Sequence, residues 1–188
     1  MWKALTGNQT LTGGIVIEYL SLNDIQSVQY IHRWHMVRTS RRQNLAEHSY
    51  TVALLAGKIA SQLNDPPTAE IWAGVLEYAL VHDIPEIDYG DIPTPTKKAL
   101  VELGHPDLIP KMEQEFWRKR GDDLDVAISP LAQKIVILAD KIEAFLYYSE
   151  EGFEKLIKDR LLADAVSYAF HEFNHEKRVL TFIRGLNR

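Results

Sequence analysis

The sequence predicts an all-α protein, a single irregular helical domain of six to seven helices. From Leu20 onward, apolar residues recur with the 3.6-residue period of an amphipathic helix. Helix start and stop signals divide the same stretch into segments joined by short connections. The 188 residues, 46% of them hydrophobic, suit one domain with one sizeable core.

The first segments of the chain differ in character. Residues 1–19 are rich in Thr and Gly, and we expect them to form an extended N-terminal arm. The helical domain then spans residues 20–188, and its first helix is expected over residues 23–34.

The second helix has the clearest start. Asn44 is followed three residues later by Glu47, which is the capping-box pattern. This helix is expected to run to about Leu63, where residues 64–67 stop it with two prolines. One stripe of the helix should face inward, formed by His48, Val52, Leu55 and Ile59.

Thr68 is expected to cap a third helix, which carries His82 and Asp83 at its C-terminal end. Pro85 disfavours helical backbone at the preceding residue, so the chain should turn away there. Residues 88–96 hold one glycine and two prolines and are expected to form a loop. The residues of the third helix expected to face inward are Ile71, Val75, Leu76, Ala79 and Leu80.

Three more helices follow. One is expected over residues 106–119, with Gly121-Asp122-Asp123 ending it. Ser129 at the cap and Pro130 at the first helical position start a helix over residues 130–148. The last helix, residues 153–173, has apolar residues that suit either the core or a homo-oligomeric partner, namely Leu161, Leu162, Val166, Ala169 and Phe170.

Composition excludes several classes of protein. The absence of cysteine excludes disulfides, thiolate metal sites and thiol nucleophiles. The net charge of −5 argues against a surface built for duplex nucleic acid. No apolar run approaches the roughly 20 residues that span a bilayer, and residues 1–19 lack the features of a signal peptide. We therefore expect a cytoplasmic protein without a membrane partner.

Polar residues occupy several positions where core residues are expected. His48 lies on an apolar stripe, His82-Asp83 ends an apolar helix, and Asp140 follows the apolar run 135–139. A buried carboxylate is costly unless it is paired or bound to a cation. Taken alone, His48 is more often a core histidine, and Asp140 equally suits an arginine partner. Together, two imidazoles and two carboxylates suit a borderline divalent cation such as Mn²⁺, Co²⁺, Ni²⁺ or Zn²⁺.

The ordered series His48, His82-Asp83 and Asp140 resembles the HD-domain metal-dependent phosphohydrolases, over about residues 20–150. Two stretches sharpen the resemblance, Arg33–Arg38 ahead of Glu47-His48-Ser49, and His82–Glu86 through Gly90–Pro95. Both are similar to the YfbR-type 5′-deoxynucleotidases, a subfamily that includes phage-type dATP triphosphohydrolases.

The resemblance implies a mononuclear site, with one divalent transition metal per chain (Mn, Co, Zn or similar, with Mg possible). Its ligands would be His48, His82, Asp83 and Asp140. Glu86 would orient or deprotonate the attacking water, and Asp91 would assist proton transfer at the leaving oxygen, although both also suit loop capping. Arg33 would contact phosphate, and Trp34 would pack against sugar or base and help exclude a 2′-hydroxyl.

Further substrate contacts are expected from residues near these motifs. Met36 suits a base pocket, although methionine more often fills gaps in a core. Two basic clusters flank the proposed site, and charge runs are usually solvated surface. Lys97 is the first of them expected to reach a phosphate; the others are Arg38, Arg41, Arg42 and Lys98.

The expected function is release of deoxynucleoside and phosphate from deoxynucleoside monophosphates. The alternative is removal of triphosphate from dNTPs, notably dATP, which the basic residues would suit. A non-catalytic metal-bearing nucleotide sensor is an alternative of another class. A di-iron oxygenase would need extra histidines between His82 and Asp140, where only His105 lies.

Overall fold

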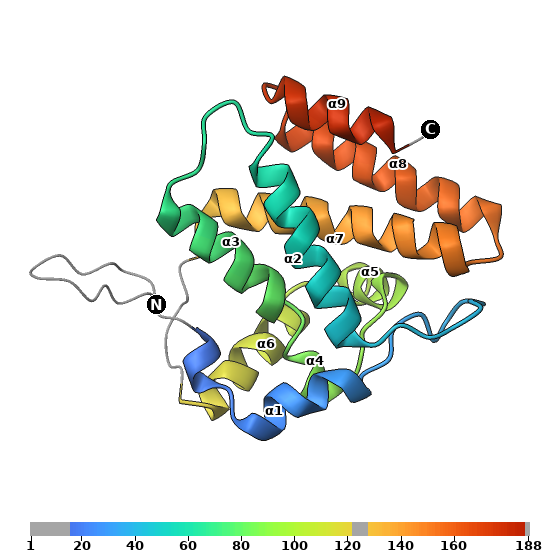
Figure 1. Ribbon diagram of the computed structural model, residues 1–188. Helices are drawn as coiled ribbons and strands as arrows, with labels where there is room; N and C mark the ends of the chain where they lie inside the picture. The colour runs from blue at the N-terminus through green and yellow to red at the C-terminus, as the bar shows by residue number, and fades with distance from the viewer. Residues whose placement is uncertain (1–15, 122–127, 187–188) are drawn as a thin grey trace, which may run out of the picture. The chain divides into compact units, whose positions relative to one another are not determined.

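The computed structural model describes residues 16–121 and 128–186, and within them the chain is α-helical with no β-strand (Figure 1). The predicted all-α class is confirmed. The helices are α1 (Leu22–Ser27), α2 (Leu45–Ala60), α3 (Ala69–Val81), α4 (Glu86–Tyr89), α5 (Thr94–Glu102), α6 (Leu108–Lys119), α7 (Pro130–Glu151), α8 (Lys155–Glu172) and α9 (Lys177–Gly185). None of them combines the length and apolar character that a bilayer-spanning segment needs.

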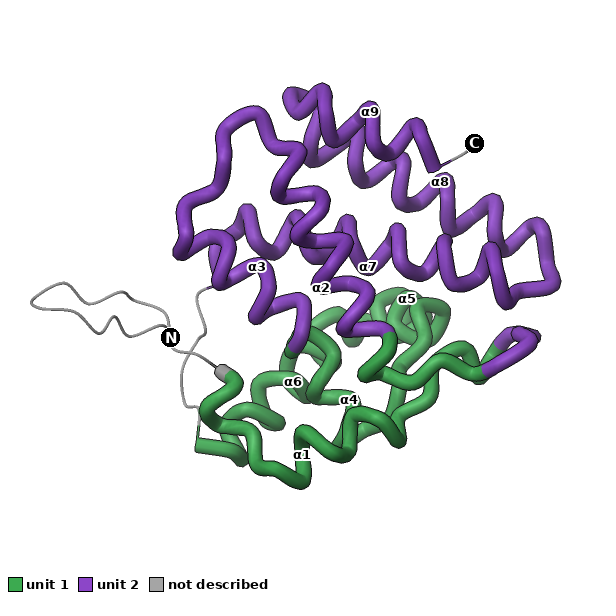
Figure 2. Tube along the Cα trace, in the orientation of Figure 1, with its two compact units in different colours: residues 1–36, 42–47, 81–127 green, residues 37–41, 48–80, 128–188 purple. Residues whose placement is uncertain are grey.

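The chain divides into two compact units (Figure 2). Unit 1 comprises residues 1–36, 42–47 and 81–127. Unit 2 comprises residues 37–41, 48–80 and 128–188. The boundary falls inside α2 and inside α3, so each of these helices contributes to both units.

The described part of unit 1 begins with the 3-10 helix Val16–Tyr19, and the rest of the expected arm, residues 1–15, lies outside the described residues. The helix expected over residues 23–34 is shorter, because α1 passes into the 3-10 turn Val28–Tyr30 and the backbone is extended at Ile31. The core of unit 1 is formed by Val28, Leu45, Val81, Ile84 and Phe116.

The segment 88–96, expected to be a loop, is a loop only over residues 90–93, because its two ends belong to α4 and α5. The single turn α4 ends where Gly90 adopts a φ of 78°, a conformation that glycine tolerates without steric cost. The two prolines of the segment 88–96 lie at the N-cap and in the first turn of α5, where a missing N–H costs nothing. Gly121 follows α6 as expected, whereas Asp122 and Asp123 lie outside the described residues.

In α2 the expected cap and stripe are both present. The Asn44 side-chain oxygen accepts a hydrogen bond from the Glu47 N–H at 2.9 Å. His48, Val52 and Ile59 are fully buried, and Leu55 packs against the core of unit 2. The helix ends at Ala60, three residues before the expected end at Leu63.

In α3 the expected cap is confirmed, but the inward face is only partly right. The Thr68 hydroxyl accepts from the Ile71 N–H at 3.3 Å. Val75 and Ala79 are fully buried, whereas Leu76 and Leu80 are each 41% exposed. These leucines lie about 100° around the helix from the buried pair, which turns them toward solvent.

The rest of unit 2 is built on α7, which packs against α8, and α8 packs against α9 (Figure 1). Pro130 begins α7 as expected, but the Ser129 side chain makes no capping hydrogen bond to a described residue. The helix expected over residues 153–173 is α8, and α9 was not expected. On α8, Ala165 and Ala169 are fully buried, while Phe170 is 41% exposed.

Candidate functional site

In unit 2 the side chain of His48 lies between two carboxylates. Its Nδ1 is 2.8 Å from Glu143 Oε2, and its Nε2 is 3.4 Å from Asp140 Oδ1. His48 and Glu143 are buried, whereas the Asp140 side chain is 38% exposed. Both carboxylates come from α7, three residues apart, and this spacing places them on one face of the helix. The unit therefore presents one imidazole and one partly open carboxylate together.

The sequence predicted His48 and Asp140 as metal ligands but gave no prediction for Glu143. A signal for it exists, since Glu143 follows Asp140 by three residues on a helix whose neighbouring positions, Ala139 and Ile142, are buried. A glutamate at such a position needs a partner, and only the fold identifies that partner as His48.

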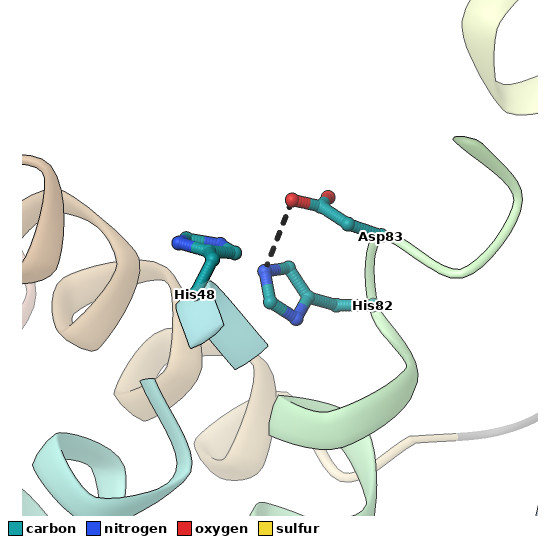
Figure 3. A group of neighbouring side chains, drawn as sticks. All are labelled: His48, His82 and Asp83. Carbon is teal, nitrogen blue, oxygen red and sulfur yellow. Dashed lines mark ion pairs between the residues drawn. The ribbon is translucent and has the colours of Figure 1, made fainter. Parts of the chain in front are cut away.

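In unit 1, His82 and Asp83 follow the last residue of α3 rather than lying within the helix. His82 Nε2 is 3.4 Å from Asp83 Oδ2, the ion pair drawn as a dashed line in Figure 3, which also draws His48. Backbone bonds from Ile84 N to Val81 O and from Glu86 N to Asp83 O turn the chain there. Both side chains remain partly accessible, at 11% and 16%.

The two His–Asp pairs share one geometric property. Two ligands about 2.1 Å from one cation lie about 3.0–3.4 Å apart at octahedral or tetrahedral angles. The nitrogen–oxygen separation is 3.4 Å in both pairs, with His48 and Asp140 in unit 2 and His82 and Asp83 in unit 1. Imidazole and carboxylate donors suit a borderline divalent metal. The donor set of each unit is therefore compatible with holding such an ion.

Arg33, expected to contact phosphate, lies against a predicted metal ligand. Its Nη1 donates to Asp83 Oδ2 at 2.8 Å. The backbone N–H of Arg33 donates to Gln43 O at 2.9 Å, which fixes the start of the side chain. Unit 1 thus holds a positive charge next to the carboxylate of Asp83.

Glu86 lies in the first turn of α4 and is buried. The pKa of its carboxyl is raised to about 8, mainly by burial and also by the nearby charges of Asp83 and Asp91. Lys97 Nζ lies 3.8 Å from Glu86 Oε1, and its charge opposes the shift. A carboxyl group that titrates near neutral pH suits proton transfer.

Asp91 lies in the short connection between α4 and α5. Its pKa is raised by burial, while the charges of Arg33 and His35 act in the opposite direction. His35 Nδ1 is 3.2 Å from Asp91 Oδ2, a partner that the sequence did not indicate. Glu86 and Asp91 therefore differ in their neighbours, which allows the two carboxyls to take different roles.

A pocket in unit 1 brings together four of the predicted site residues. Its polar lining includes His82, Asp83, Glu86 and Lys97. Apolar side chains form much of the remaining wall, with Tyr89, Ile92 and Met112 among them. Unit 1 therefore gathers an imidazole, two carboxyls and an ammonium group at one pocket with partly apolar walls.

The residues predicted to contact base and sugar lie outside this lining. Trp34 has a φ of 65°, unusual for a residue with a side chain, and its indole Nε1 donates to Gln43 Oε1 at 3.1 Å. Gln43 is buried. Met36 is 58% exposed. Trp34 is thus fixed by a buried partner, whereas Met36 is largely solvated.

Two of the basic residues predicted near the site have partners within unit 2. Arg41 pairs with Glu151 at 3.0 Å, and the guanidinium of Arg38 lies 4.6 Å from the ring centroid of Phe153. Arg42 and Lys98 are exposed, as is His105.

Comparison with known proteins gives a consistent picture. The family model described as "5'-deoxynucleotidase YfbR-like" matches residues 21–154. A protein of Acinetobacter phage SH-Ab 15497 named dATP triphosphohydrolase is 29% identical over 172 residues, covering 85% of this chain and 82% of the relative. The 5'-deoxynucleotidase YfbR of Escherichia coli O1:K1 / APEC is 28% identical over 141 residues, covering 68% of this chain and 70% of the relative.

Among solved structures, the HD phosphohydrolase DatZ of cyanophage S-2L, bound to dA and one catalytic Zn²⁺ ion, superposes with a TM-score of 0.72. The alignment covers 89% of this chain and 97% of DatZ at 22% identity. At this identity the likeness establishes a shared fold.

Proposed function

Because the chain belongs to the YfbR-like 5′-deoxynucleotidase family, we propose that it is a divalent-metal-dependent hydrolase of deoxynucleotide phosphate esters. The favoured reaction releases deoxynucleoside and phosphate from deoxynucleoside 5′-monophosphates. The observation that carries the proposal is the pair of His–Asp contacts, each with its nitrogen and oxygen 3.4 Å apart. Asp83 also lies near groups that can assist phosphoryl transfer. These are Arg33, at 2.8 Å, and the carboxyl of Glu86, whose pKa is about 8.

The proposed ligands of a single divalent transition metal are His48, His82, Asp83 and Asp140. Zn²⁺, Mn²⁺ and Co²⁺ fit this donor set well, and Mg²⁺ is the harder alternative. When bound, the cation supplies positive charge that activates water and stabilises the phosphoryl group. Four protein ligands leave room for water when the coordination number is five or six.

Proton transfer is assigned to the two carboxyls of unit 1. Glu86 orients the attacking water and accepts its proton, a role that suits a carboxyl with a pKa of about 8. Asp91 assists protonation of the leaving 5′-oxygen. The contact between His35 and Asp91 supports this role, because an imidazole at 3.2 Å can hold that carboxyl in place and exchange protons with it.

Arg33 and Lys97 are the proposed phosphate contacts. The guanidinium of Arg33 lies next to the carboxylate of Asp83. A planar guanidinium can bind phosphate with two parallel hydrogen bonds. Lys97 lines the pocket with Glu86, and its side chain is 41% exposed, so its ammonium group can reach a ligand. Trp34 and Met36 are assigned to the sugar and base, with Trp34 disfavouring a 2′-hydroxyl.

Removal of triphosphate from dNTPs is the second candidate. Two phage relatives named dATP triphosphohydrolase match 85% and 81% of this chain, more than the 68% matched by the Escherichia coli YfbR, whereas a third, from cyanophage S-2L, matches 65%. The exposed side chains of Arg42 and Lys98 would suit a longer phosphate chain. We also propose that the protein is cytoplasmic and forms a homo-oligomer, dimeric or larger. Light scattering after gel filtration measures the oligomeric state.

Chromatographic product analysis distinguishes the candidates. The Zn²⁺- or Mn²⁺-loaded protein is incubated with the four dNMPs, the four dNTPs and their ribose counterparts, with an Asp83→Asn variant as the control. Deoxynucleoside plus phosphate from dNMPs supports the favoured reaction. Deoxynucleoside plus triphosphate from dNTPs supports the second. No turnover by a metal-loaded protein overturns both and favours a nucleotide sensor.

A further inference from the structure

The buried carboxylate of Glu143 has no part in the proposed reaction, yet it faces a proposed metal ligand. We infer that Glu143 is a positioning residue that holds His48 in the tautomer with its proton on Nδ1 and its Nε2 lone pair directed to the cation. This inference rests on the proposed function, because it assumes that His48 binds a metal.

The contact is short and enclosed. Glu143 Oε2 lies 2.8 Å from His48 Nδ1, and the two side chains are 3% and 0% exposed. At such depth an ionised carboxylate is stable only when hydrogen-bond donors satisfy it. The His48 ring provides a donor when Nδ1 carries the proton.

The position of the proton follows from hydrogen-bond chemistry. A neutral imidazole has one N–H and one lone pair, and an ionised carboxylate only accepts. With Glu143 on the Nδ1 side, the lone pair therefore lies on Nε2. That nitrogen faces Asp140 Oδ1 at 3.4 Å, a separation that fits two ligands of one cation.

The two carboxylates of α7 thus have different tasks. The 2.8 Å contact of Glu143 is a hydrogen-bond distance, shorter than the spacing of two donors that share a metal. Asp140 is the more exposed of the two, at 38%, and is the one proposed to bind the cation. A carboxylate behind a metal-binding histidine fixes the orientation of its ring and raises its basicity.

The first test uses the wild-type protein loaded with Zn²⁺. Long-range ¹H–¹⁵N NMR of the histidine rings should show His48 with a proton on Nδ1 and the metal on Nε2. A His48 ring with its proton on Nε2 would overturn the inference. Because the measurement uses the wild-type protein, it does not depend on the folding of a variant.

The second test compares Zn²⁺ affinity, measured by competition with a chelator, for wild type, Glu143→Gln and Glu143→Asp. Removing a carboxylate behind a metal ligand typically weakens binding by about 10- to 100-fold. We expect a loss in this range for Glu143→Gln and a smaller loss for Glu143→Asp, which keeps the charge. The matched control is Glu150→Gln, an exposed glutamate on the same helix, which should bind as wild type does.

The outcomes separate this inference from the proposed function. A wild-type protein that does not bind Zn²⁺ refutes the metal site, and the inference falls with it. A wild-type protein that binds Zn²⁺ while folded Glu143→Gln binds equally well leaves the proposed function intact and overturns the role of the Glu143 carboxylate in metal binding. Circular dichroism of the metal-free variants establishes that they are folded.

Discussion

The guanidinium of Arg33 lies 2.8 Å from the carboxylate of Asp83, although fifty positions separate the two residues in the sequence. The side chains are 14% and 16% exposed, so the pair is only partly screened by solvent. The residue predicted to contact phosphate and a residue predicted to bind metal are therefore neighbours in unit 1. The charge of Arg33 therefore lies beside a carboxylate that is proposed to bind the cation.

Replacing Asp83 with Asn should abolish turnover while preserving the helical fold. The amide keeps the shape of the side chain but loses the charge that attracts both Arg33 and a cation. We expect bound metal, measured by mass spectrometry, to fall well below one ion per chain, and activity to fall by at least about 100-fold. Asp107→Asn, an exposed aspartate of unit 1 whose partner is Lys111, is the matched control. An active Asp83→Asn enzyme would disprove the metal assignment.

Glu86→Gln should stabilise the metal-free protein at pH 8 and have little effect at pH 5. In the folded chain the pKa of Glu86 is raised from 4.5 to about 8, mainly by burial. Between these values the folded state binds the proton that the unfolded state has released, so wild-type stability falls as pH rises. Glutamine does not titrate and avoids this loss, which amounts to up to about 5 kcal/mol.

Urea unfolding at several pH values measures the difference between Glu86→Gln and wild type. The exposed Glu102 of α5 offers a control, since Glu102→Gln should show no such pH-dependent gain. Equal pH profiles for Glu86→Gln and wild type would mean that Glu86 is not held in its neutral form.

Asp24→Asn should destabilise the protein at neutral pH, and the effect should disappear in acid. A hydrogen bond from Arg120 at 2.6 Å lowers the pKa of Asp24 to about 2, aided by bonds from Ser21. The stabilisation from this carboxylate is complete above the unfolded pKa of 3.8 and is lost as pH falls through about 2. We expect about 2 kcal/mol at pH 7. Asp65→Asn, at an exposed aspartate outside the helices, should change little at any pH.

Trp34 allows backbone strain to be separated from side-chain function. Its φ of 65° is unfavourable for any residue with a Cβ, whereas glycine adopts it freely. Trp34→Gly should therefore be more stable than Trp34→Ala by about 1 kcal/mol in urea unfolding, although both lose the indole. Both variants should also lose discrimination between deoxyribose and ribose substrates, measured as a ratio of kcat/KM values. An Ala variant as stable as the Gly variant would argue against strain.

The fold class and most helices were predictable because caps and apolar periods act locally. Asn44 and Thr68 cap their helices through contacts only three residues away. The features that the sequence predicted wrongly depend on contacts between residues farther apart in the chain. Leu76 and Leu80 look apolar enough for a core, but the rotation of α3 is set by its neighbours in unit 2. The prolines of segment 88–96 are typical of a loop, yet they also fit the start of a helix.

The candidate site divides in the same way. His48, His82 and Asp83 were recognisable because their residue types are unusual in apolar surroundings. The contacts of Glu143 with His48 and of His35 with Asp91 join residues 95 and 56 positions apart, so nothing local indicates them. Gln43 is similar, because its hydrogen bond to Trp34 depends on the bridge between His32 and Asn44 that brings their segments together.

The placement of Asp140 and Glu143 on α7 has a consequence for how this protein can diverge. One residue inserted between them would rotate Glu143 by about 100° around the helix axis, although every side chain would still be present. Homologues with altered helix register at this point would lose the arrangement around His48 without losing any of its chemical groups. Helical phase, rather than residue identity alone, is the property that a sequence comparison must preserve here.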